Sequence, residues 1–336
     1  MIGVQGMDLV RSATKILKHC ELKEGDEVVV YADTGKPPSV VQSFFAAALG
    51  LGVEPILSVF PQRRIMLQEP TQSALELMKA STMVVDCATD AWLYTKGLNA
   101  ILDTGGRVLQ VLAEEASIAK MTPNESQVRR AEAAASMFDQ ANKVRITSEA
   151  GTDIVADCRG RPGWGQDGVV RKPGDWDSAA TAIYAVAPLE DRMDGTMVLE
   201  PGDFVWTFPE PMHLHERIKL TVDGGRLVKV EGSNQALRLE RWLHAFNDPN
   251  SYVIAHTGFG GDPRASLDRA QEVESIEGGI NIAFGGNLFR GLGGKTRAKS
   301  HVDIVVMHQS MHLDGKLVVE DGRIVHPKLK IAASKS

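Results

Sequence analysis

Residues 1–120 alternate between helical and strand-like hydrophobic patterns, and this alternation is the strongest constraint on the fold. Stretches with helical spacing separate four short runs rich in β-branched residues, at 26–33, 54–60, 82–87 and 107–112. Strands that alternate with helices form parallel sheets covered by helices. No G-x-G-x-x-G follows the first strand. We therefore expect an α/β domain with Rossmann-like layering and no dinucleotide site.

From Lys143 onward the pattern changes to short strands joined by tight turns. Ala150-Gly151, Pro201-Gly202, Gly224-Gly225 and Asp321-Gly322 mark the turns of predicted hairpins. One helical stretch, at 234–248, interrupts them. This texture predicts an α+β domain built around an antiparallel sheet.

A predicted helix start at residues 122–125, with Thr122 as cap and Pro123 in the first turn, lies between the helix–strand alternation and the run of hairpins. We place the boundary there, which gives an α/β domain at 1–125 and an α+β metal-binding catalytic domain at 126–336. Pockets favour domain interfaces and the carboxyl ends of parallel strands, so we expect the site between the two domains.

Composition narrows the function classes. The chain has 336 residues and a net charge of -6, which disfavours a nucleic-acid binder. Cys20, Cys87 and Cys158 lie far apart, so neither a disulfide framework nor a thiolate zinc site is indicated. No apolar run reaches the roughly 18 residues of a membrane span, and residues 1–20 have the spacing of an amphipathic helix and lack the continuous apolar core of a signal peptide. We expect a cytoplasmic protein with no membrane or nucleic-acid partner.

Three residues between 251 and 306 could share one metal ion. In a strand, side chains at i and i+2 point to the same face, so His301 and Asp303 project together while Val302 turns away. His256 is the third candidate. Two imidazoles and one carboxylate form the facial triad of non-haem iron(II) oxygenases. From spacing alone, a buried histidine and an aspartate that satisfy ordinary hydrogen bonds explain the pattern equally well.

A second histidine pair, His213 and His215, has the same i, i+2 spacing. It is followed by Glu216, Arg217 and Lys219, which are typical of a solvated strand. We interpret this pair as a surface feature.

Several longer segments carry a family resemblance that covers nearly the whole chain. The strand SHVDIVVM resembles the His-x-Asp strand of the M29 (thermophilic aminopeptidase) superfamily. The wider match resembles the oxygenase branch of that superfamily, the 2,5-dihydroxypyridine 5,6-dioxygenases. The segments that carry it are TGGRVLQV, MTPNESQVRRAEAA, SEAGTD, KPGDWD, DGTMVLEPGDFV, HTGFGGDPRA and GGN.

The resemblance implies an Fe(II)-dependent dioxygenase that uses O2 to open a hydroxylated N-heterocycle such as 2,5-dihydroxypyridine, giving N-formylmaleamate, or a related hydroxyarene. It implies that His256, His301 and Asp303 bind iron, and that the protein is a homo-oligomer. Where the family has a catalytic histidine after its VVD strand, this chain has Tyr94.

Three further residues are candidate substrate contacts. Trp92 lies close to Tyr94 in the sequence, Arg264 follows the His256 segment and could hold an oxyanion, and Asn287 ends the GGN segment. We expect Trp92 and Tyr94 to face the metal across the cleft between the domains.

Two other functions are compatible with the sequence. One is a metal-dependent hydrolase like the aminopeptidase branch, which would need a second cluster of ligands for a paired metal. The sequence shows no such cluster. The other is a relative that binds metal without catalysis.

Overall fold

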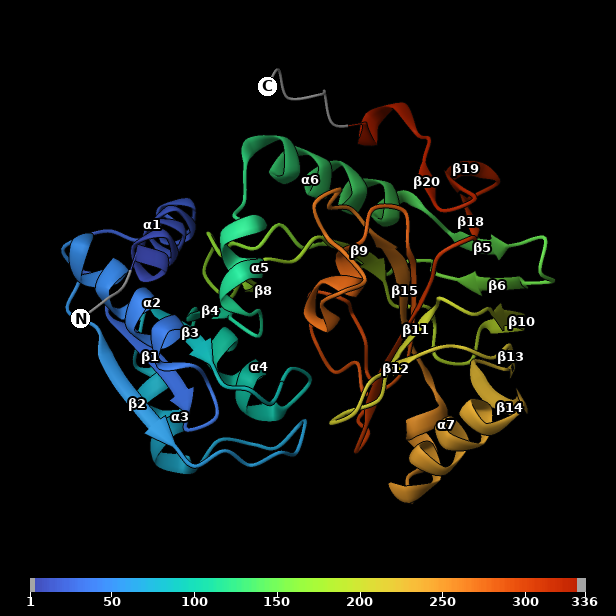
Figure 1. The fold of residues 1–336 in the computed structure, drawn as a ribbon, viewed down its shortest axis with the longest axis horizontal. Helices are drawn as coiled ribbons and strands as arrows, with labels where there is room; N and C mark the ends of the chain where they lie inside the picture. The colour runs from blue at the N-terminus through green and yellow to red at the C-terminus, as the bar shows by residue number, and fades with distance from the viewer. Residues whose placement is uncertain (1–3, 331–336) are drawn as a thin grey trace. The chain divides into compact units, whose positions relative to one another are not determined.

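The computed structural model describes residues 4–330, which form two compact units (Figure 1). The first unit comprises Met1–Glu125 and Gln166–Thr181, and the second comprises Ser126–Gly165 and Ala182–Ser336. The chain therefore returns to the first unit within the range 126–336 that the sequence pattern assigns to the second domain. The returning segment carries a strand of three residues, which is too short to leave a hydrophobic period in the sequence.

The first unit contains a five-stranded parallel sheet in the order β2-β1-β3-β4-β8. This confirms the predicted α/β layering. Its elements are α1 (Val4–His19), β1 (Val28–Asp33), α2 (Pro38–Gly50), β2 (Ile56–Phe60), α3 (Gln72–Lys79), β3 (Met83–Cys87), α4 (Lys96–Asp103), β4 (Arg107–Gln110), α5 (Glu115–Lys120) and β8 (Trp176–Ser178).

One predicted helix begins later than its sequence pattern suggests. The apolar spacing from Asp90 favours a helix that includes Trp92 and Tyr94, but α4 begins at Lys96. Tyr94 has a φ of 70°, in the left-handed region that a right-handed helix excludes. Thr95 then caps α4 by accepting a hydrogen bond from the N–H of Leu98 at 3.2 Å. Trp92 and Tyr94 therefore lie in the loop between β3 and α4.

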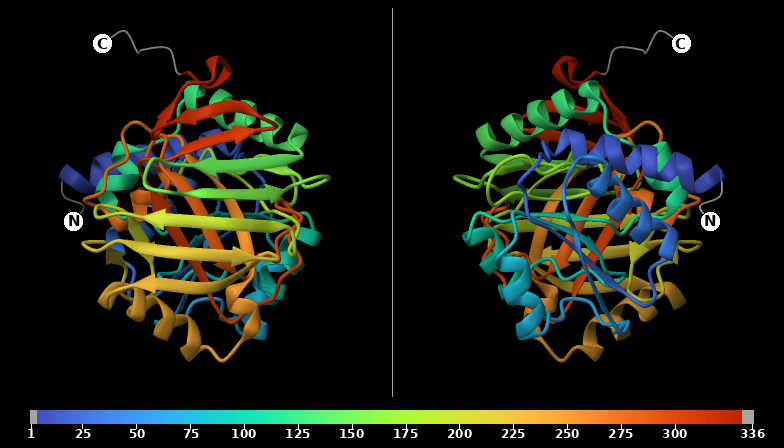
Figure 2. Two further views of the ribbon diagram at one scale, coloured as in Figure 1. Left: turned by 90° about the vertical axis from the view of Figure 1, so that its right-hand side faces the viewer. Right: turned by 90° about the vertical axis from the view of Figure 1, so that its left-hand side faces the viewer.

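The second unit contains two antiparallel sheets, which refines the predicted α+β domain. One has eight strands in the order β14-β13-β10-β6-β5-β18-β19-β20, and the other has seven in the order β12-β11-β17-β16-β15-β9-β7. In Figure 2 the strands of the two sheets cross one another, one sheet behind the other.

The elements of the second unit follow here in chain order. They are α6 (Glu125–Gln140), β5 (Lys143–Thr147), β6 (Asp153–Asp157), β7 (Gly163–Gly165), β9 (Ile183–Val186), β10 (Met193–Leu199), β11 (Phe204–Trp206), β12 (Met212–His213), β13 (Ile218–Asp223), β14 (Arg226–Gly232), α7 (Asn234–Ala245), β15 (Ile254–Gly260), β16 (Ile280–Gly285), β17 (His301–Val306), β18 (Ser310–Leu313), β19 (Lys316–Glu320) and β20 (Arg323–Ile324), with 3-10 turns at Pro249–Tyr252, Ala270–Ser275 and Pro327–Leu329.

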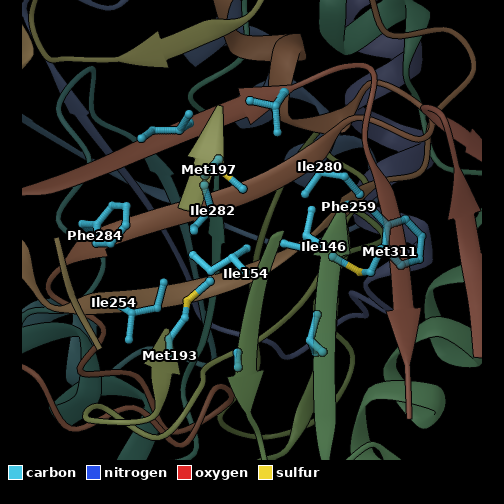
Figure 3. Packing of buried hydrophobic residues seen from close by; sticks show 14 of the residues in the cluster. Ile146, Ile154, Met193, Met197, Ile254, Phe259, Ile280, Ile282, Phe284 and Met311 are labelled. Carbon is cyan, nitrogen blue, oxygen red and sulfur yellow. The ribbon is translucent and has the colours of Figure 1, made fainter. Parts of the chain in front are cut away.

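The two sheets enclose one apolar core, to which both contribute every second residue. Ile154 and Met193 come from the eight-stranded sheet, and Ile282, Phe284 and Ile254 come from the seven-stranded sheet (Figure 3). Because side chains alternate along a strand, the residues between these core positions lie on the other face of the seven-stranded sheet. That second face carries the candidate metal ligands, and we call it the metal face. None of the described helices is long and apolar enough to cross a membrane.

Candidate metal centre

The metal face brings His256 and Asp303 together across three neighbouring strands. His256 on β15 is paired with Ala283 on β16, and Ala283 is paired with Asp303 on β17. The three residues therefore form one row. Ala283 presents only a methyl group between the other two, so their longer side chains can converge above it. His301 lies two residues before Asp303 and shares its face, as the i, i+2 spacing predicts.

A β-bulge in β15 turns His256 toward the metal face. Ile254 is paired with Phe284 and His256 with Ala283, so two steps along β15 match one step along β16. Ile254 and Phe284 both lie in the core between the sheets. In a regular strand His256 would share the face of Ile254 and point into that core. The extra residue reverses the alternation, which is a common use of bulges near functional sites.

The donor atoms of the three residues converge in a buried cluster. Nε2 of His256 lies 3.1 Å from Oδ1 of Asp303, and Nε2 of His301 lies 3.2 Å from Asp303 Oδ2. One ligand atom from each residue falls within 4.8 Å of the others. Donors that occupy adjacent positions around a divalent ion, with bonds of about 2.1 Å, lie roughly 3 Å apart. The three residues therefore fit a single metal ion.

The hydrogen bonds around His301 fix its tautomer for metal binding. Nδ1 of His301 lies 2.7 Å from the carbonyl oxygen of Gly286, and a carbonyl can only accept, so the Nδ1–H donates to it. This leaves the lone pair of Nε2 for a metal. His256 has no corresponding support, because its Nδ1 is buried without a hydrogen-bond partner among the described residues.

The electrostatics of the cluster favour a bound cation. Burial would raise the pKa of Asp303, but the two imidazoles hold it below its usual range, so the carboxylate is ionised. Burial lowers the pKa of His256. Burial alone would also lower the pKa of His301, but the negative charge of Asp303 outweighs it and raises that pKa. An ionised carboxylate beside two imidazoles is a suitable set of donors for a divalent ion.

Glu274 is a neighbour of this cluster that the sequence pattern does not single out. It lies in the turn Ala270–Ser275, and its carboxyl group hydrogen-bonds to Asp303. Burial, and then the charge of Asp303, raise the pKa of Glu274 well above its usual value. A lone acidic residue in a short turn leaves no motif, so only the fold reveals this contact.

The other histidine pair lies outside the cluster. His213 and His215 are both exposed, and His213 packs edge-on against the ring of Phe204 at 4.9 Å. Within residues 4–330 the cluster of His256, His301 and Asp303 is the only one of three or more potential ligands.

The four other candidate residues lie in different surroundings. Trp92 is buried in the first unit and packs edge-on against Tyr31, and Tyr94 is buried in the same loop. Arg264 follows β15, and its guanidinium group donates to both carboxylate oxygens of Asp262 and to Gln127 Oε1. Asn287 is fully buried in the second unit, and its amide is hydrogen-bonded to backbone atoms at both ends.

Comparison with known proteins shows the family of this chain. The sequence profile of the family described as "2,5-dihydroxypyridine 5,6-dioxygenase" matches residues 8–326. The chain belongs to this family. A 2,5-dihydroxypyridine 5,6-dioxygenase from Pseudomonas putida is 32% identical over 266 residues, which cover 76% of this chain and 74% of that protein.

Solved structures agree with the sequence match. The structure of a Pseudomonas putida 2,5-dihydroxypyridine dioxygenase superposes with a TM-score of 0.89 at 27% identity, over 98% of this chain and 100% of the other. Wild-type AmpT from Thermus thermophilus superposes with a TM-score of 0.61 at 15% identity, over 95% of this chain and 99% of the other, and shows the fold alone. The predicted fold, family and enzyme class, a ring-cleaving dioxygenase, are thus confirmed.

Proposed function

We propose that His256, His301 and Asp303 bind a ferrous ion, and that the protein uses O2 to cleave a hydroxylated N-heterocycle such as 2,5-dihydroxypyridine. The observation that carries this proposal is the set of two imidazoles and one carboxylate, buried on one face of a sheet. Three protein donors leave positions free for substrate and oxygen. The names of the Pseudomonas relatives support the substrate class.

A ferrous ion held by His256, His301 and Asp303 would supply the redox chemistry that lets a hydroxylated ring react with O2. Both oxygen atoms enter the product, N-formylmaleamate in the case of 2,5-dihydroxypyridine, so no external reductant is needed. Asp303 would offset part of the charge of the ion, and the carbonyl oxygen of Gly286 holds the ring of His301 with its Nε2 free to bind. The burial of all three ligands excludes bulk water from their donor atoms.

We further propose that the Tyr94 hydroxyl donates a hydrogen bond or a proton during the reaction. An unperturbed phenol has a pKa of about 10, so it serves better as a donor than as a base near neutral pH. The left-handed backbone of Tyr94 supports a functional position, because such a conformation costs a non-glycine residue on the order of 1 kcal/mol.

We also propose that the substrate is bound by Trp92, Arg264 and Asn287. Trp92 would offer an aromatic surface to the ring. Arg264 would have to share its guanidinium group between Asp262, Gln127 and a substrate oxygen. The amide of Asn287 is already bonded on both sides, so a direct contact would come from its backbone or require one of those bonds to break.

Reconstitution with metal tests the proposal. Protein loaded anaerobically with Fe(II) should retain about one iron per chain and should consume O2 with 2,5-dihydroxypyridine, while the ultraviolet absorbance of the ring disappears. A panel of hydroxylated pyridines and hydroxyarenes then ranks the substrates. Activity supported by zinc alone would contradict an oxygenase.

The same samples separate the dioxygenase from a hydrolase of the AmpT fold. Such a hydrolase would release the chromophore of an aminoacyl-anilide without oxygen uptake. The single three-residue cluster of residues 4–330 disfavours the paired metal that this chemistry would use. Iron binding without turnover of any ring would indicate a non-catalytic relative.

We also propose that the protein works in the cytoplasm. Cys20, Cys87 and Cys158 are buried free thiols, and burial raises the pKa of each to about 12. Inert, unpaired thiols are typical of proteins from a reducing compartment.

A further inference from the structure

Strand β2 is an edge strand with apolar side chains exposed on both of its faces. Ile56 is 53% exposed, Leu57 46% and Val59 56%, and no residue of β2 is buried. Its neighbour β1, by contrast, is buried along its whole length. Edge strands are usually protected by charged side chains, bulges or covering elements, because their free backbone groups pair readily with other strands. The run Ile56–Phe60 contains no charge.

The pairing with β1 determines which backbone groups of β2 are free. The N–H of Thr34 donates to the carbonyl oxygen of Phe60 at 3.0 Å, so Phe60 directs its backbone polar groups toward β1. These directions alternate along a strand, so Ser58 and Ile56 also face β1. Leu57 and Val59 therefore direct their N–H and C=O groups away from the sheet. An additional strand could bind to these groups.

We propose that β2 pairs with β2 of a second copy of the chain, antiparallel, about a two-fold axis at Ser58. In this register Leu57 faces Val59 of the partner subunit, and Ile56 faces Phe60 of the partner subunit. Leu57 and Val59 carry the outward backbone groups, so they form the hydrogen-bonded pairs and Ser58 forms the close, non-hydrogen-bonded pair. The two five-stranded sheets then become one continuous sheet.

The sequence of β2 is self-complementary in this arrangement. Every side-chain pair in the register is apolar except the central serines, so no like charges meet. In this register the exposed Glu54 lies opposite Gln62 of the partner subunit, next to Arg63 of the partner subunit. Two-fold symmetry repeats this arrangement at the other end.

Proline limits the pairing to the centre of the strand. Pro55 and Pro61 flank β2 and lie opposite each other in the proposed register. Neither has an N–H to donate, so the ladder ends at Leu57 and Val59. A pairing that ends at both sides favours a closed dimer contact over extended aggregation.

Strand β14, an edge of the eight-stranded sheet, shows the contrast. It also exposes one β-branched residue, Val228, at 57%. It carries Arg226, Lys229 and Glu231 within seven residues, which is the usual protection of an edge. Val228 therefore provides a matched control for substitutions in β2.

The mass of the full-length protein in solution tests the proposal. Light scattering after gel filtration should give the wild type a mass that is an even multiple of one chain. Leu57→Lys combined with Val59→Lys places like charges opposite one another, so it should raise the dissociation constant by at least about 100-fold and halve the mass. Val228→Lys should leave the mass unchanged. A monomeric wild type, or an unchanged mass in the double variant, would overturn the proposal.

Cysteine crosslinking tests the register. It also tests the pairing of β2 with β2 independently, should the lysine variant fail to fold. Ser58→Cys should form an intersubunit disulfide on mild oxidation, because the Cα atoms of a non-hydrogen-bonded pair lie about 4.5 Å apart. Ile56→Cys should not crosslink, since position 56 of each subunit lies opposite position 60 of the other and far from the second position 56. Val228→Cys serves as the control on β14. Equal crosslinking at positions 56 and 58 would refute the two-fold axis at Ser58.

Discussion

Asn287 donates its side-chain amide to the carbonyl oxygen of Ala255 at 2.9 Å, and Ala255 is the extra residue of the bulge that turns His256 to the metal face. The other end of the same amide accepts a hydrogen bond from the N–H of Thr296 at 2.8 Å. Asn287 therefore joins the bulge to the glycine-rich loop after β16. A bulge disrupts the ladder locally, and this fully buried side chain satisfies the carbonyl.

Asn287→Ala should weaken iron binding, because it removes the support of the bulge. We expect a loss of about 10- to 100-fold in metal affinity, the usual effect of residues that orient metal ligands. Titration of the apoprotein with Fe(II) under anaerobic conditions measures it. Thr257→Val is the matched control, since it removes a buried hydroxyl on β15 that donates to the carbonyl oxygen of Asn281 on β16. Equal iron affinity in both variants would assign Asn287 to stability alone.

Each ligand is expected to be essential for the metal. His256→Ala, His301→Ala and Asp303→Ala should each lose iron on gel filtration while the circular dichroism spectrum stays close to that of the wild type. His213→Ala should keep its iron, because the His213 side chain is exposed on β12 and lies outside the cluster. Iron lost from His213→Ala but retained by His256→Ala would show that the triad is misassigned.

Ala283 is expected to be critical although it binds nothing. It lies between His256 and Asp303 in the row across the three strands. Ala283→Val adds two methyl groups where the ligand side chains converge, so iron content should fall sharply while the fold persists. Ile282→Val, on the core face of the same strand, should lower stability by about 0.5–1.5 kcal/mol and retain iron. Iron content and urea unfolding of both variants check this contrast.

Asp86 is expected to make stability depend on pH. Burial raises the pKa of Asp86 to about 7. The backbone N–H of Ala88, the charge of Lys36 and the side-chain amide of Gln110 favour the charged form, but burial outweighs them. A carboxyl group whose pKa is higher in the folded state stabilises the fold when it is protonated. This contribution is complete below about pH 4 and is lost as the pH rises to about 7.

Asp86→Asn should remove that pH dependence. Urea unfolding between pH 5 and pH 8 should show a smaller decrease in stability than in the wild type, by on the order of 1–3 kcal/mol. Asp321→Asn, at a carboxylate that is 72% exposed, is the control and should follow the wild type. A wild-type slope in Asp86→Asn would place the titration elsewhere.

Local sequence patterns predict the individual strands of this fold. They predict less well the contacts between strands that are far apart in the sequence. The β-branched runs predict β1 to β4, and the spacing of His301 and Asp303 predicts their common face. The bulge at Ala255 leaves no such pattern, because it depends on how β15 pairs with β16. Glu274 likewise reaches Asp303 only through the folded turn. Tyr94 shows a further limit, since its apolar neighbours suggest a helix that its backbone excludes.

Tyr94→Phe tests whether the first unit contributes a proton donor. The substitution keeps the aromatic ring and its packing and removes only the hydroxyl group. If the hydroxyl donates during the reaction, turnover of 2,5-dihydroxypyridine should fall by roughly 10- to 1,000-fold, in the range of single acid–base groups. Iron content should not change, because the proposed metal ligands are His256, His301 and Asp303.

Tyr31→Phe is the matched control for this change. Tyr31 is also buried in the first unit, where it stacks on Phe60 with the ring centroids 4.5 Å apart. Removing its hydroxyl should leave turnover close to that of the wild type. If Tyr94→Phe also turns over at the wild-type rate, Tyr94 contributes packing only. In that case the proton must come from another group, and the left-handed backbone at Tyr94 serves only to start α4 at the right place.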